Sequence, residues 1–219
     1  MKVDLVVPES NMKDYTFKGC LNYEQSHLKA QDDFYLRTFG NIESINRHPY
    51  GKTELDTELQ QQDIDLTLKL KNGDEVTISE KNRTRNYKDI LLEIYQGYPN
   101  NIVPGWWYKS KAKTLAYFIP NDNIVYLIEE KSLREFFNKY VEPIINPELF
   151  RKVYNARPTA GYAKNIGIDV DGNTETITLS QSYTIDQITN TKRMVENVCI
   201  PVDCLKRHGV KLWQFPMKP

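Results

Sequence analysis

The stretch DIDLTLKLKNGDEVTISEKNRT, residues 63–84, decides the fold. Apolar residues alternate with polar ones from Asp63 to Leu70, which is the period-two pattern of a half-buried strand. Asn72-Gly73 is the strongest short signal for a hairpin turn, and the alternation resumes after it. The stretch therefore predicts an antiparallel hairpin over residues 63–83, whose second strand ends in a dense cluster of charge.

The segments around the hairpin predict an α/β fold. Apolar residues at helical spacing predict helices near residues 24–39 and 131–142. Short apolar runs predict a third strand at 89–95, beside the second, and a later hairpin at 114–128. The polar segment 41–61, broken by Pro49 and Gly51, is interpreted as a loop. This order of elements predicts a central mixed β-sheet flanked by helices.

The C-terminal third differs in composition from the rest of the chain. Beyond about residue 150 it is richer in Thr, Asn and Asp, and short strands are predicted at 165–170, 175–181 and 197–202. Asp171-Gly172 is interpreted as a turn, because the calcium-loop ligands that should follow it are missing. We expect one domain over residues 1–219, with a core at about 22–142 and a β-rich extension at about 150–219 that enlarges the core sheet or forms a small added lobe.

Composition limits the possible classes of protein. The chain has 219 residues and a formal net charge of zero, which argues against broad electrostatic capture of nucleic acid but allows local basic patches. Its three cysteines form no CxxC pair, so we expect reduced thiols. The first ten residues are too charged for a signal peptide, and no apolar run approaches the ~18 residues of a membrane span. We therefore expect a cytoplasmic protein without a membrane partner.

The end of the hairpin contains candidate catalytic residues. Period-two alternation places Asp63 and Asp65 on the polar face of the first strand, and Ser79 and Lys81 on the matching face of the second. Glu80 has the opposite parity and needs a bulge or strong twist to join them. Carboxylates that converge with a lysine favour a Mg²⁺ or Mn²⁺ site, because these ions prefer hard oxygen ligands. The alternative is an exposed hairpin tip with ordinary surface ion pairs.

An aspartate, a hairpin, an acid and a lysine follow one another here in an order that resembles the motif of the PD-(D/E)XK nuclease superfamily. The sequence around this motif is similar to that of phage-type members whose motif is degenerate. The resemblance covers about residues 28–140 and is strongest at 62–93. It implies a restriction-endonuclease-like core that uses Mg²⁺ to cleave phosphodiester bonds. It also implies that Asp65 binds the metal, that Lys81 is the motif lysine, and that the acid two positions earlier is a ligand.

The sequence departs from this pattern at one position. Ser79 occupies the usual acidic place, and Glu80 lies directly beside Lys81. Two substitutes remain open for the second carboxylate: Glu80, through a distorted strand, or Glu93, at the end of the third strand. The candidate metal ligands are thus Asp65, Glu80 and Glu93, with Lys81 assisting the attacking water. If neither glutamate reaches the site, the chain is an inactive relative that binds nucleic acid.

A basic and aromatic stretch follows the hairpin and has the composition of a nucleic-acid surface. The candidate contacts are Arg83, Arg85, Lys88, Trp107, Lys109 and Lys111. A solvated charged face and aromatic core residues are the alternative interpretation of the same stretch.

These observations give three hypotheses for function. The first is a Mg²⁺-dependent nuclease acting on DNA. The second is a non-catalytic nucleic-acid-binding or phage accessory protein on the same scaffold, and the third is a protein-interaction domain. A homodimer is possible, because many nucleases cut both strands as dimers, although no residue pattern marks a dimer seam. We also expect Lys81→Ala to fold normally, since a lysine at a strand end is usually exposed.

Overall fold

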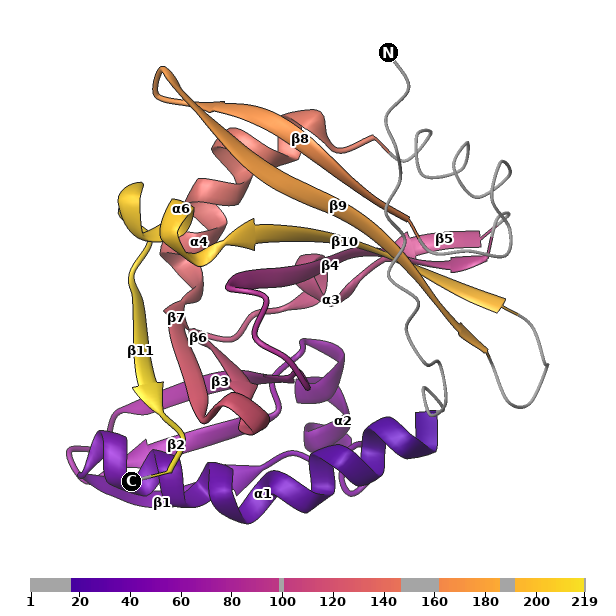
Figure 1. Cartoon of the computed structure of the whole chain (residues 1–219). Coiled ribbons are helices and arrows are strands. Elements are labelled where there is room, and N and C mark those ends of the chain that lie inside the picture. The colour runs from indigo at the N-terminus through magenta and orange to yellow at the C-terminus, as the bar shows by residue number, and fades with distance from the viewer. Residues whose placement is uncertain (1–16, 99–100, 147–161, 186–191, 219) are drawn as a thin grey trace.

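The predicted hairpin is confirmed at the centre of a six-stranded mixed sheet in the computed structural model, which describes residues 17–98, 101–146, 162–185 and 192–218. Its strands are β2 (Leu66–Leu70) and β3 (Glu75–Asn82), with Leu66 opposite Ile78. Gly73 has a φ of 89°, a left-handed conformation that favours glycine in the turn. The strand order of this first sheet is β1-β2-β3-β6-β7-β11 (Figure 1).

One parallel pair makes the first sheet mixed. β3 runs parallel to β6 (Thr114–Ile119), whereas β1 (Ile42–Arg47), β7 (Ile124–Glu129) and β11 (Leu212–Pro216) pair antiparallel with their neighbours. Helix α1 (Phe17–Phe39) lies along one face of this sheet (Figure 1). Its buried Phe34 and Tyr35 pack there in a cluster with Leu66, Leu68, Ile78, Ala116 and Phe118.

The interpretation of residues 41–61 as a loop is wrong. They contain the edge strand β1 and the helix α2 (Glu54–Gln61). The pairing register of β1 shifts between Ile42 and Ser44. The apolar residues of this strand do not alternate regularly, so its sequence lacks the strand pattern. Helix α2 has no buried residue and so no apolar stripe, but Thr53 caps it by accepting a hydrogen bond from the Asp56 N–H.

The third predicted strand exists as β4 (Asp89–Tyr98), but its expected place beside the hairpin is wrong. The neighbour of β3 is β6, and β4 lies in a second, antiparallel sheet of order β5-β4-β10-β9-β8. The other strands of this sheet are β5 (Asn101–Pro104), β8 (Tyr162–Val170), β9 (Asn173–Ile185) and β10 (Lys192–Pro201). The predicted C-terminal strands are therefore confirmed, but they join β4 and β5 in this second sheet through the pairing of β10 with β4, and not the first sheet.

Short helices connect the two sheets. The predicted helix at 131–142 is α4 (Glu130–Phe136), which continues as a π-helical turn (Phe137–Val141) and a 3₁₀ turn (Glu142–Ile144). Helix α3 (Trp106–Lys109) is a single turn, a 3₁₀ turn (Pro120–Asp122) joins β6 to β7, and α6 (Val202–Arg207) leads from β10 towards β11. No helix within the described ranges is long and apolar enough to cross a membrane.

A carboxyl group is buried in the second sheet without compensation. Glu196 of β10, which lies opposite Gln181 of β9, is 3% exposed. Among the described residues, its Oε2 has no hydrogen-bond partner and neither has the Gln181 amide. Burial raises the pKa of Glu196 from 4.5 to about 8.

We predict that Glu196→Gln stabilises the protein at and above pH 8. The folded state holds the Glu196 proton up to about pH 8, whereas the unfolded state releases it near pH 4.5, so wild-type stability falls as the pH rises between these values. The gain should be on the order of a few kcal/mol. Urea unfolding at pH 5 and pH 8.5 measures it, with the exposed Glu135→Gln as control. An equal effect at both pH values would contradict the prediction.

Candidate functional site

A cleft of about 980 Å³ lies where the first sheet, the second sheet and α1 approach one another. This volume is in the range of small-molecule and substrate sites. The first sheet and its connections contribute Arg47, Asp65, Glu80 and Lys81, and the second sheet contributes Leu91, Glu93, Ser182, Val195 and Asn197. The cleft therefore contains all four residues that the sequence predicts to be catalytic.

The hairpin register determines which acid meets the lysine. Continuing the pairing of Leu66 with Ile78 by three residues places Asp63 opposite Lys81. The Lys81 ammonium donates a hydrogen bond to Asp63 Oδ1 at 2.7 Å, and Ser79 Oγ donates to Asp63 Oδ2 at 2.6 Å. The ion pair is largely buried, because the Lys81 side chain is 19% exposed and that of Asp63 is 14% exposed. The serine at the usual acidic position thus orients Asp63.

Three carboxylates act electrostatically on the Lys81 ammonium. Burial by itself lowers the pKa of Lys81, but the charges of Asp63, Asp65 and Glu93 outweigh it and raise the pKa above its usual value. The ammonium also lies 4.5 Å from the centre of the Trp106 ring. Lys81 is therefore a positively charged group at neutral pH.

Two hydrogen bonds orient the Asp65 carboxylate, which lies just before β2. The backbone N–H of Glu80 donates to Asp65 Oδ2 at 2.6 Å, and the Gln60 amide donates to Oδ1 at 3.1 Å. Asp65 is thereby attached to β3 on one side and to α2 on the other.

Glu80 points to the opposite face of β3, as its parity requires, towards α1. Arg47 Nη1 donates to Glu80 Oε2 at 2.7 Å, and Tyr35 Oη donates to Oε1 at 2.9 Å. Arg47 also binds Asp32 of α1 at 2.8 Å. Burial raises the pKa of Glu80, opposed by the hydrogen bonds and charge of Arg47. Both oxygens of Glu80 are therefore used in a structural network that joins α1, β1 and β3.

Glu93 enters the cleft from the second sheet. It lies on β4 opposite Asn197 of β10, and both residues line the cleft. A β-carbon at Gly105 would lie 2.4 Å from the Glu93 carbonyl oxygen, so only glycine allows the chain to pass so close. Burial raises the pKa of Glu93, whereas Arg193, Lys81 and Lys109 lower it. The carboxylate accepts the backbone N–H of Trp106.

Charge in the cleft is not balanced by Lys81 alone. Lys81 pairs with Asp63, and Glu80 pairs with Arg47, which leaves Asp65 and Glu93 as the oxygen donors that a cation could use. In the described part of the chain, however, only Glu175, Cys204 and His208 form a group of three candidate ligands within 4.8 Å of one another. Asp65 and Glu93 do not belong to such a group of three among the described residues.

The predicted nucleic-acid contacts occupy different environments. Arg85, Lys88, Lys109 and Lys111 are exposed. Arg83 lines the cleft, forms an ion pair with Asp89, and lies 4.7 Å from the centre of the Tyr87 ring.

The inclusion of Trp107 does not fit the structure. Its ring is 0% exposed, with the Arg134 guanidinium 4.3 Å from the ring centre, so it belongs to the core. Trp106 is the tryptophan that lines the cleft.

The catalytic site predicted from the sequence did not include Asp63 and Arg47. Asp63 has the same parity as Lys81, so hairpin alternation contained the signal for their contact. Arg47 lies in the segment interpreted as a loop, and its sequence carries no signal for the contact with Glu80.

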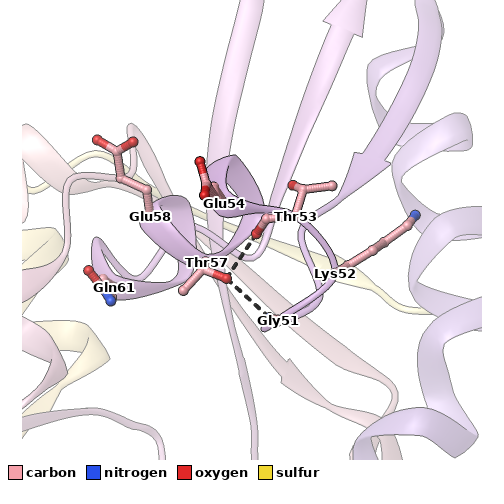
Figure 2. A pocket seen from close by; sticks show the side chains of 7 residues that line it. All are labelled: Gly51, Lys52, Thr53, Glu54, Thr57, Glu58 and Gln61. Atoms are coloured by element: carbon pink, nitrogen blue, oxygen red, sulfur yellow. Dashed lines mark hydrogen bonds between the residues drawn. The ribbon is translucent and has the colours of Figure 1, made fainter.

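A second surface depression has no comparable chemistry. Figure 2 shows seven lining residues, all from the segment 51–61 at the start of α2. Some of its polar groups bond to one another: Gly51 N donates to Thr57 Oγ1 at 3.2 Å, and Thr57 Oγ1 donates to the Thr53 carbonyl oxygen at 2.9 Å. We therefore assign the candidate site to the cleft.

Burial of the ion pair changes the expectation that Lys81 contributes little to stability. We predict that Lys81→Met destabilises the fold by roughly 3–5 kcal/mol, because it leaves Asp63 buried without its cation. Adding Asp63→Asn should restore part of the loss, which denaturant unfolding of both variants and the double variant measures. The matched control Lys69→Met breaks an exposed pair with Glu43 and should cost less than about 1 kcal/mol. Equal costs at the two lysines would contradict the prediction.

Comparisons of the chain with protein-family models, curated proteins and solved structures found no match.

Proposed function

We propose that the chain is a metal-dependent nuclease that hydrolyses phosphodiester bonds in DNA. One observation carries the proposal: in an open cleft, a lysine ammonium lies among three carboxylates, and two of these remain after the lysine has paired with Asp63. The remaining pair, Asp65 and Glu93, matches the charge of a divalent cation. Mg²⁺ in phosphoryl-transfer sites is commonly bound by one or two carboxylates, with substrate phosphate and water completing the shell.

Each cleft residue has a role in this proposal. Asp65 and Glu93 would hold Mg²⁺ or Mn²⁺, which when bound polarises the phosphoryl oxygen and lowers the pKa of a water molecule. Lys81 offsets negative charge that develops on the phosphate, a role that its raised pKa supports because the ammonium stays charged. Ser79 and Asp63 hold Lys81 in place. Glu80 is left out of the ligand set because its charge is paired with the Arg47 guanidinium.

The arrangement of strands supports a restriction-endonuclease-like core. Asp65 stands at the start of β2 and Lys81 near the end of β3, within a mixed sheet that α1 covers on one face. This is the placement that the resemblance to the PD-(D/E)XK superfamily implies. Ser79 stands where the motif has an acid, and in this proposal Glu93 supplies the missing carboxylate. Glu93 reaches the cleft from the second sheet and not from a neighbouring strand of the first.

A second candidate function is nucleic-acid binding without cleavage. The observation that favours it is the ion pair of Glu80 with Arg47, which neutralises the acid of the motif. The two functions differ in one measurable property, because only the nuclease requires a divalent ion for product formation.

We predict cleavage of plasmid or oligonucleotide DNA with Mg²⁺ or Mn²⁺ and none with EDTA. Asp65→Asn and Glu93→Gln should each reduce the rate at least about a hundredfold, because each removes a charged ligand. The matched control Glu43→Gln alters an exposed glutamate on β1 and should cut like wild type. Circular dichroism of each variant checks folding.

Two outcomes would contradict the nuclease. Wild-type protein that cuts neither DNA nor RNA with any divalent ion supports binding without cleavage. Cleavage that survives both Asp65→Asn and Glu93→Gln places the active site outside this cleft.

We predict that Arg85→Ala and Lys88→Ala weaken DNA binding by similar factors for all sequences. Both side chains are exposed on the connection from β3 to β4 and would contact phosphate. Each substitution should reduce the slope of log K against log salt concentration by about 1. Fluorescence anisotropy at several salt concentrations measures this slope. Lys164→Ala, exposed on the edge strand β8, is the control, and an equal effect there would contradict a localised binding surface.

A further inference from the structure

A second cluster of ligand-type side chains lies away from the cleft, around α6. Cys204 belongs to α6, and His208 follows it by four residues, with a helical hydrogen bond from His208 N to the Cys204 carbonyl oxygen at 3.1 Å. Glu175 reaches them from β9, and His208 Nε2 lies 2.9 Å from Glu175 Oε1. One ligand atom from each of the three lies within 4.8 Å of the other two.

The spacing of these residues suits chelation. Residues four apart on a helix lie on one face, so Cys204 and His208 present sulfur and nitrogen in the same direction. Thiolate, imidazole and carboxylate together are the donors that Zn²⁺ accepts in tetrahedral sites, whereas Mg²⁺ prefers oxygen alone. The donor chemistry therefore differs in kind from that of the cleft.

The surroundings of the cluster favour a bound ion over a simple surface pair. Cys204 is 0% exposed, and the side chains of His208 and Glu175 are each 13% exposed. A divalent ion would be neutralised by the thiolate and the carboxylate. Arg207 binds both oxygens of Glu175, at 3.1 and 2.7 Å, and can keep orienting the carboxylate from outside the shell.

We propose that Glu175, Cys204 and His208 bind a Zn²⁺-type transition-metal ion that fastens the β8–β9 hairpin to α6. Coordination to Cys204 forms a sulfur–metal bond and releases the thiol proton to solvent. At His208 and Glu175, the ion takes the place of the hydrogen bond between Nε2 and Oε1, and His208 binds it as the neutral imidazole whose proton is on Nδ1. A water molecule completes the fourth position.

The location gives this site a structural role. Helix α6 follows β10 of the second sheet and leads to β11, the edge strand of the first sheet. The left of Figure 1 shows α6 beside α4, below the tip of the β8–β9 hairpin. An ion that joins β9 to α6 would therefore stabilise the return of the chain from one sheet to the other.

Cobalt substitution tests the site directly. Full-length protein in a Cys20→Ser, Cys199→Ser background is titrated with Co²⁺, whose thiolate complex has a near-ultraviolet charge-transfer band and whose tetrahedral complexes absorb strongly in the visible. We expect both signals at one ion per chain, their loss on addition of one equivalent of Zn²⁺, and no displacement by Mg²⁺. Zn²⁺ should also raise the midpoint of thermal unfolding.

Single substitutions test which side chains bind the ion. Cys204→Ser should eliminate the charge-transfer band, and His208→Gln and Glu175→Gln should weaken Co²⁺ binding. Restoring Cys199, a buried cysteine whose Sγ is 3.9 Å from Ser180 Oγ, should change nothing. Circular dichroism confirms that each variant folds, and if Cys204→Ser unfolds, the His208→Gln titration decides alone.

The proposal is overturned if folded protein gives no band at millimolar Co²⁺, or if the band survives both Cys204→Ser and His208→Gln. It does not depend on the nuclease activity, because Asp65→Asn should leave the Co²⁺ spectrum unchanged. A spectrum that Asp65→Asn removes would place the ion in the cleft and also overturn the proposal.

Discussion

The apolar core that both sheets share is the constraint on which the cleft depends. Ile90, Leu92 and Ile94 of β4 belong to the same buried cluster as Leu115 and Tyr117 of β6. Burial of these side chains, each contributing roughly 1.5–3 kcal/mol, holds the second sheet against the first. Because buried residues alternate along β4, Glu93 points away from this cluster and into the cleft. The packing of apolar side chains thus determines where a carboxylate of one sheet meets a lysine of the other.

The charged residues on the two faces of β3 have different partners. On one side of β3 the buried cation of Lys81 is held by Asp63, and on the other side Glu80 is held by Arg47. A strand forces this separation, since adjacent side chains point to opposite faces. The acid that lies next to the lysine in the sequence therefore anchors α1, while Asp65 and Glu93, which we propose as Mg²⁺ ligands, lie at positions farther away in the sequence. The sulfur and nitrogen donors around α6 form a chemically different set that favours a softer ion.

Much of the local structure followed from the sequence. Period-two alternation and Asn72-Gly73 predicted the hairpin, and helical spacing predicted α1 and α4. The same alternation placed Lys81 on the face of the aspartates and Glu80 on the other, and the structure has both side chains in those directions. These predictions succeeded because the pattern of a strand or an amphipathic helix is fixed by its own repeat. Where a bulge interrupted the repeat, as in β1, or where a short helix buried no residue, as in α2, no clear periodic pattern indicated the element.

Only the tertiary structure decided which elements become neighbours. The sequence predicted β4 as a strand, but its partner β10 begins at Lys192, about a hundred residues later, and local alternation carries no information about that pairing. The position of Trp106 at the cleft, where it is half-buried, and the full burial of Trp107 were likewise settled by the packing of α3 against the core. Glu175 meets His208 for the same reason. Periodicity determines the direction of a side chain relative to its own strand or helix, whereas long-range packing determines what that side chain faces.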